Sequence, residues 1–133
     1  MQLLKFTLAL KIFLTVCWAA SLLFLSKAQF RKLGIAEPQP IVFTRLLGAA
    51  FLALLVGYAL GLREIYQGEV PSNTIFVGVV SNGLACLILI YFGLKKMWSE
   101  WGRMARYSMW ASAALTGLIT MLLVLSFYII RHS

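Results

Sequence analysis

The sequence predicts an all-α protein, a four-helix transmembrane bundle with short loops, and three observations support this prediction. Of its 133 residues, 62% are hydrophobic and only 12% are charged. A water-soluble domain of this size has too little polar surface to cover so many apolar side chains. The apolar residues gather in four runs of about 20 residues, the length that crosses a hydrocarbon core of ~30 Å. None of these runs alternates polar and apolar residues as a membrane β-strand does.

The four runs place the expected helices at residues 4–26, 41–62, 74–94 and 107–130 of a single transmembrane domain, 1–133. In lipid, a helix satisfies its backbone groups internally, so we expect each run to be helical. The first run is similar to a signal peptide, with Lys5 ahead of its apolar centre. No small-residue cleavage site of the usual type follows it, so we expect a retained first helix.

The basic residues indicate how the bundle is oriented in the membrane. Eight of the twelve lie in or beside the first and third connections, namely Lys27, Arg31, Lys32, Arg45, Lys95, Lys96, Arg103 and Arg106. The other four lie at the opposite side, namely Lys5, Lys11, Arg63 and Arg131. The positive-inside rule therefore predicts that loops one and three are cytoplasmic and that both termini are periplasmic. Lys5, ahead of the first helix, argues for the reverse orientation.

The third connection combines basic residues with tryptophan. Trp98, Trp101 and Trp110 lie close to this end of the bundle, and an indole ring suits the membrane interface. We expect them to be interface anchors, and a short interfacial helix could form among them. Most of the basic residues behind the net charge of +8 lie just outside the spans, which favours anionic lipid headgroups at loops one and three and argues against nucleic acid. Ordinary anchoring and a site for one specific lipid are both open interpretations.

Small residues recur every four positions along the second helix. Ala49, Ala53, Gly57 and Gly61 share one helical face. Membrane helices approach one another closely at such faces, because lipid supplies no hydrophobic force that joins them. The face therefore predicts a helix-packing site, whose partner is either a helix of the same chain or a helix of another copy.

Polar side chains inside the spans are expected to face the interior of the bundle, because lipid offers them no partner. Asn82 is the one amide within a span. Ser112 and Thr116 belong to a Ser/Thr face on the fourth helix, which either pairs with Asn82 or bonds back to its own carbonyls. Interhelical hydrogen bonds are one interpretation of these groups, and a polar permeation path is the other.

Two cations enter the spans. Arg45 lies within reach of the headgroups, and Glu37 and Glu100 on the same side could pair with it. Lys11 lies about 10 Å inside the first helix, where an unpaired ammonium is costly. We expect either an ion pair between Lys11 and Glu64 at that end of the bundle, or a first helix that begins later and leaves Lys11 near the interface.

Residues suited to catalysis are scarce. The one histidine is His132, the penultimate residue, and the chain contains no aspartate. No nucleophile lies beside a general base, and no Cys/His spacing suits a metal. Cys17 and Cys86 lie inside spans and are expected to be small packing residues. The sequence therefore predicts a protein that is not an enzyme and binds no cofactor or metal.

Two stretches carry a resemblance to a known family. The segment from Glu37 to Glu64, with Arg45-Leu46-Leu47-Gly48 at the start of the second helix, is one of them, and Val77 to Gly83 is the other. Both resemble small bacterial membrane proteins of the DoxX-like type. The resemblance implies a compact four-helix bundle in a bacterial inner membrane. Because relatives include subunits of quinol-oxidising complexes, it also implies an accessory role beside respiratory or redox proteins.

These observations favour a non-enzymatic small membrane protein, an accessory or scaffold subunit that forms a homo-oligomer or part of a larger membrane complex. Two alternatives stay open. One is a small transporter or channel, based on Lys11, Asn82 and the Ser/Thr face of the fourth helix. The other is a protein that binds a lipid or quinone between its helices.

Overall fold

The computed structural model describes residues 1–35 and 41–132. Its helices are α1 (Gln2–Phe24), α2 (Lys27–Lys32), α3 (Ile41–Tyr66), α4 (Ser72–Leu94) and α5 (Arg103–His132). Over these ranges the chain contains no β-strand, which confirms the all-α class. The four long helices match the four expected spans, and α2 is a short helix within the expected first loop.

Each of the four long helices can cross a membrane. They contain 23 to 30 residues and each is sufficiently apolar. At 1.5 Å per residue they are roughly 35–45 Å long, enough for the hydrocarbon core and part of the headgroup layers. α3 and α5 extend four residues past the expected bounds, to Tyr66 and from Arg103, because a helix continues into the polar interface where hydropathy falls. The chain is therefore a multi-pass helical membrane protein.

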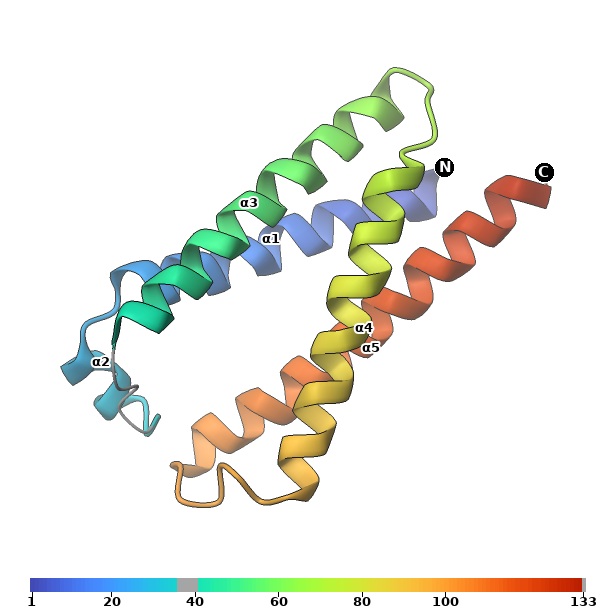
Figure 1. The fold of residues 1–133 in the computed structure, drawn as a ribbon. Coiled ribbons are helices and arrows are strands. Elements are labelled where there is room, and N and C mark those ends of the chain that lie inside the picture. Colours follow the sequence, from blue (N-terminus) through green and yellow to red (C-terminus); the bar gives the residue numbers. More distant parts are fainter. Residues whose placement is uncertain (36–40, 133) are drawn as a thin grey trace.

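The long helices form two antiparallel pairs, α1 with α3 and α4 with α5 (Figure 1). Packing between α1 and α5 joins the pairs, whereas α3 and α4 share the least contact of these neighbours. Figure 1 shows α3 and α4 close together beside their connecting loop and diverging away from it. Both termini lie at the end of the molecule that carries this loop.

The apolar core lies in the half of the bundle nearer the termini. Its buried members come from all four long helices and are Leu4, Leu8, Tyr58, Ile65, Ile75, Ile119 and Leu123. Gly78 allows α4 to approach α5 here, because a Cβ at this position would lie 2.7 Å from a methyl carbon of Leu123. This half is therefore the closely packed part of the bundle.

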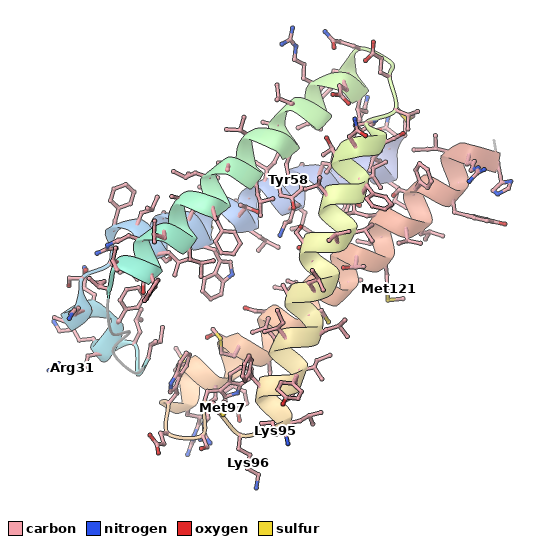
Figure 2. All side chains as sticks on the ribbon, viewed as in Figure 1. Arg31, Tyr58, Lys95, Lys96, Met97 and Met121 are labelled. Atoms are coloured by element: carbon pink, nitrogen blue, oxygen red, sulfur yellow. The ribbon has the colours of Figure 1, made fainter. Side chains whose placement is uncertain are left out.

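Basic side chains gather at the opposite end. Figure 2 shows Arg31 on α2 and Lys95 and Lys96 after α4, all far from the two termini. The structure thus places the first and third connections at one end, because successive loops of a transmembrane bundle alternate between its two ends.

The short helix α2 is specified by its own sequence. Ser26 and Gln29 form a capping box, in which the Gln29 amide accepts from the Ser26 N–H at 2.7 Å and the Ser26 hydroxyl accepts from the Gln29 N–H at 3.3 Å. Phe30 is the buried residue of this helix. No helix forms among the third-loop tryptophans, where residues 95–100 make successive turns. The short helix considered for the third loop is therefore not found there, and α2 in the first loop was not expected.

Two glycines join the first and third connections. The N–H of Gly102 donates to the carbonyl oxygen of Gly34 at 2.8 Å. Gly34 has φ +74°, and a Cβ there would lie 3.0 Å from Cα of Gly102. Glycine is thus required by its backbone conformation and by the close approach. This contact ties α2 to the start of α5.

The three tryptophans do not share one environment. Trp98 is buried, with 8% of its surface exposed, and its ring packs edge-on to Trp110 at 6.2 Å and near Trp101 at 6.5 Å between centroids. Gly93 leaves room for the rings of Trp98 and Trp110. Trp98 is therefore part of a small aromatic core that closes the end of the α4–α5 pair, and the expectation that it is an exposed anchor at the membrane interface was wrong. Trp110 is exposed and keeps that expected role as a prediction.

Candidate functional site

Lys11 is the buried cation of the bundle and defines the candidate site. It lies roughly 13 Å along α1 from the first helical residue, near the middle of the span. Only 7% of its surface is exposed. Its ammonium donates to the side-chain oxygen of Asn82 on α4 at 2.6 Å. This bond crosses from one antiparallel helix pair to the other.

Both the oxygen and the nitrogen of the Asn82 side-chain amide form hydrogen bonds. Its nitrogen donates to the carbonyl oxygen of Gly78, one turn earlier on α4, at 2.6 Å. This bond turns the amide oxygen toward Lys11. Asn82 is 1% exposed, which confirms that it faces the interior of the bundle.

Tyr58 brings α3 into the same cluster. Figure 2 shows Tyr58 in the interior, between the ribbons of α3 and α4. Its hydroxyl lies 2.9 Å from the hydroxyl of Ser81 on α4, and its ring centroid lies 5.6 Å from the Lys11 ammonium. The ring thus presents its π electrons within the range of a cation–π contact. Lys11, Tyr58, Ser81 and Asn82, named here the mid-span cluster, connect three helices.

The sequence reasoning did not assign Tyr58 to a site, although one signal was present. Tyr58 lies deep within an apolar run, and a buried phenol normally needs a hydrogen-bond partner. The partner, Ser81, adjoins Asn82 in the sequence. The sequence therefore indicated that Tyr58 needs a polar partner. It did not indicate which helix supplies that partner, because the apolar pattern does not show which helices face each other.

Lys11 does not pair with Glu64, and the register of α1 against α3 gives the reason. The ammonium of Lys5 lies 4.9 Å from the ring centroid of Tyr66, while that of Lys11 lies beside Tyr58. Glu64 is therefore about six residues, or roughly 9 Å, nearer the membrane surface than the level of Lys11. The proposed Lys11–Glu64 pair was wrong. α1 also begins at Gln2, so the alternative of a late helix start was wrong as well.

The Ser/Thr face of α5 bonds to its own backbone. Ser112 donates to the carbonyl oxygen of Ser108 at 2.8 Å, and Thr116 donates to that of Ser112 at 2.8 Å. Thr120 continues the series by donating to the carbonyl oxygen of Thr116. Back-bonding is the second of the two expected outcomes, so these hydroxyls do not extend the mid-span cluster into a continuous polar path.

Arg45 binds the end of α1. Its guanidinium donates to the carbonyl oxygens of Leu22 at 2.7 Å and Leu25 at 2.8 Å. The last carbonyls of a helix have no partner within the helix, and a cation there also complements the helix dipole. Glu100, which was considered as a partner, is exposed in the third loop, and Glu37 lies outside the described residues. Arg45 is therefore a helix-capping residue.

Most of the small-residue face of α3 is exposed, although Ala53 and Gly57 also line a cavity between α3 and α4. Ala49, Ala53 and Gly57 are exposed, and a Cβ on Gly57 would meet nothing within 4 Å. Gly61 alone packs within the chain, against Thr74 of α4. The close contact with α1 occurs at Gly48, where a Cβ would lie 2.7 Å from Leu23. Within the chain, the expected packing role thus holds for Gly61, and a neighbouring face of α3 meets α1.

A cavity of about 180 Å³ lies between α3 and α4 beside the mid-span cluster. It is lined by Ala53, Leu54, Gly57 and Tyr58 from α3 and by Asn73, Thr74 and Val77 from α4. Asn73 and Ser72 do not cap α4, because Pro71 occupies the N-cap position.

Among the described residues, no three His, Cys, Asp or Glu side chains gather as metal ligands do. Both cysteines are free; Cys86 packs toward Gly117, whereas Cys17 is exposed. Comparison with protein families, with curated proteins and with solved structures finds no match to this chain.

Proposed function

We propose that this protein is a non-enzymatic membrane subunit that packs against a second membrane helix through α3, as an accessory or scaffold component of a membrane complex. The observation that carries the proposal is the exposed face formed by Ala49, Ala53 and Gly57. A Cβ added at Gly57 would meet no atom of the rest of this chain within 4 Å. Small residues at this spacing allow two backbones to pack closely in lipid. The partner helix belongs to another copy or to another protein.

The polar residues of the spans support a structural role. Lys11 bonds to Asn82, and Arg45 bonds to the end of α1. Thr116 bonds to its own helix. Each of these groups therefore uses its hydrogen bond to hold this chain together rather than to present a reactive group.

Gly57→Leu tests the proposal, because it adds bulk to the exposed face and the added Cβ meets nothing in this chain. Ala59→Leu is the matched control, since Ala59 is also exposed on α3 but lies on a different side of the helix. Size-exclusion chromatography with light scattering in mild detergent should show an oligomer or partner complex for the wild type and Ala59→Leu. Gly57→Leu should yield the dissociated protein. A wild-type protein that is monomeric and copurifies with no partner would overturn the proposal.

The resemblance to DoxX-like proteins supports a partner among the respiratory or redox complexes of a bacterial inner membrane. Crosslinking in membranes followed by mass spectrometry tests this choice of partner. Crosslinks from α3 to a quinol-oxidising complex are expected. Crosslinks from α3 only to a second copy of this chain would instead support the self-associating scaffold.

A transporter is the second candidate function, and the Lys11–Asn82 bond at mid-span is the observation that favours it. Flux of small anions into proteoliposomes tests it. Transport by the wild type that is lost in Asn82→Leu would support this candidate. Equal leakage in wild type, Asn82→Leu and empty vesicles would exclude it.

A further inference from the structure

A second cavity lies at the end of the bundle that carries the first and third connections. Its volume is about 300 Å³, at the lower end of the range typical of small-molecule pockets. α1 contributes Cys17, Trp18 and Ser21, the α2 region contributes Phe30, and α5 contributes Met104 and Ser108. The Gly102–Gly34 hydrogen bond holds the α2 region and the start of α5 together beside it.

The wall of this cavity suits hydrocarbon. The Ser21 hydroxyl donates to the carbonyl oxygen of Cys17 at 2.8 Å, and that of Ser108 donates to the carbonyl oxygen of Ala105 at 2.8 Å. Both hydroxyls are thus engaged by their own helices, and the rest of the wall is aromatic, aliphatic or sulfur. Water gains little in such a site, while an empty cavity loses dispersion contacts. In a membrane, an acyl chain is the available group that fills it.

Basic residues accompany the cavity on the elements that line it. On α5, Arg103 and Arg106 immediately flank the lining residues Met104 and Ala105. On α2, Lys32 lies two residues after Phe30 and is exposed. The described acidic residue at this end is Glu100, so the local charge is strongly positive. An apolar cavity whose lining elements also carry cationic residues complements a molecule with a hydrocarbon tail and an anionic head.

We propose that this cavity, lined by α1, α2 and α5, binds one acyl chain of an anionic glycerophospholipid, whose phosphate lies against Arg103, Arg106 and Lys32. The chain fills the cavity and the headgroup charge provides the selectivity. Selectivity has to come from the headgroup, because a tail gains little by leaving other tails. This proposal is independent of the packing of α3 against a partner.

Retention of added lipid tests the apolar part of the site. Purified protein is mixed with phosphatidylglycerol or with phosphatidylcholine of the same acyl chains, and bound lipid is counted by native mass spectrometry. The wild-type protein should retain more phosphatidylglycerol than phosphatidylcholine. Ser21→Phe, which places a ring in the cavity, should lose most of this retention. Ala114→Phe, at an exposed position on α5 that lies on a different side of the helix from the lining residues, is the matched control and should retain lipid as the wild type does.

Charge removal tests the headgroup part. The variant Arg103→Gln with Arg106→Gln should lower the preference for phosphatidylglycerol by about fivefold or more, given the attraction of basic residues to anionic lipid. Lys95→Gln with Lys96→Gln removes the same charge at the same end, from a segment that does not line the cavity. This control should leave the preference unchanged. An equal loss in both variants would overturn a specific headgroup site in favour of general surface attraction.

Thiol labelling of the unaltered protein provides a test that needs no variant. Cys17 lines the cavity, whereas Cys86 packs toward Gly117 on the α4–α5 pair. Phosphatidylglycerol should slow maleimide labelling of Cys17 several-fold, and Cys86 serves as the internal reference. Phosphatidylcholine should have a smaller effect. Labelling of Cys17 that neither lipid changes would overturn the proposal.

Discussion

The ammonium of Lys11 lies 2.6 Å from the side-chain oxygen of Asn82, which joins α1 to α4 near the middle of the bundle. α1 packs along α3 and α4 packs along α5, so this bond links the two antiparallel pairs. α3 and α4 make little contact away from their shared loop. The relative position of the pairs thus depends strongly on this polar contact and on the packing of α1 against α5.

Asn82→Leu should destabilise the protein by about 1–3 kcal/mol, because it leaves the buried Lys11 ammonium without its acceptor. Reversible unfolding in mixed micelles with increasing SDS measures the change. Lys11→Met alone removes the cation and should cost less than Asn82→Leu. The double variant should be more stable than the sum of the single effects predicts. Strict additivity would show that the two side chains do not interact.

Arg45→Gln should cost about 1–3 kcal/mol, since two carbonyl oxygens at the end of α1 lose a charged donor. Arg45→Lys should recover only part of this loss, because an ammonium cannot match the two-pronged geometry of a guanidinium. Hydrogen exchange at residues 22–33 locates the effect at the junction of α1 and α2. Full recovery by lysine would indicate that charge alone, rather than the pair of bonds, matters.

Gly34→Ala should be more destabilising than Gly68→Ala, although both glycines have positive φ. Each substitution places alanine in the left-handed region of backbone conformation, which lowers the free energy of unfolding by about 1–2 kcal/mol. At Gly34 the added Cβ also lies 3.0 Å from Cα of Gly102, whereas at Gly68 it meets nothing within 4 Å. Thermal unfolding in detergent compares the two variants. Equal shifts in Tm would show that the contact between the two connections adds no stability.

A phosphatase reporter that is active only outside the cytoplasm should be active when fused after Ser133. The positive-inside rule places the loops with more basic residues in the cytoplasm, and the termini lie at the other end of the bundle. A reporter inserted after Lys96 should be inactive. Figure 2 shows Lys96 at the opposite end of the molecule from the termini, so the two fusions report opposite sides. The reverse pattern of activity would place the termini in the cytoplasm.

The sequence by itself determined the number of membrane-spanning helices, their approximate ends and the burial of Asn82. Helix formation in lipid follows from length and apolarity, which are properties of each segment alone. A polar amide in a span turns inward whichever helices surround it. These features do not depend on how the helices are arranged, so the apolar runs and a single residue type were enough to predict them.

The tertiary structure alone decided the partner of Lys11, the exposure of Ala49, Ala53 and Gly57, and the burial of Trp98. Each depends on which faces of which helices meet. In water, hydrophobic periodicity reveals the inner face of a helix. In lipid, both the inner and the outer faces are apolar, and helices associate through packing and a few polar contacts. For this reason the sequence did not distinguish Asn82 from Glu64 as the partner of Lys11, and the arrangement of the helices did.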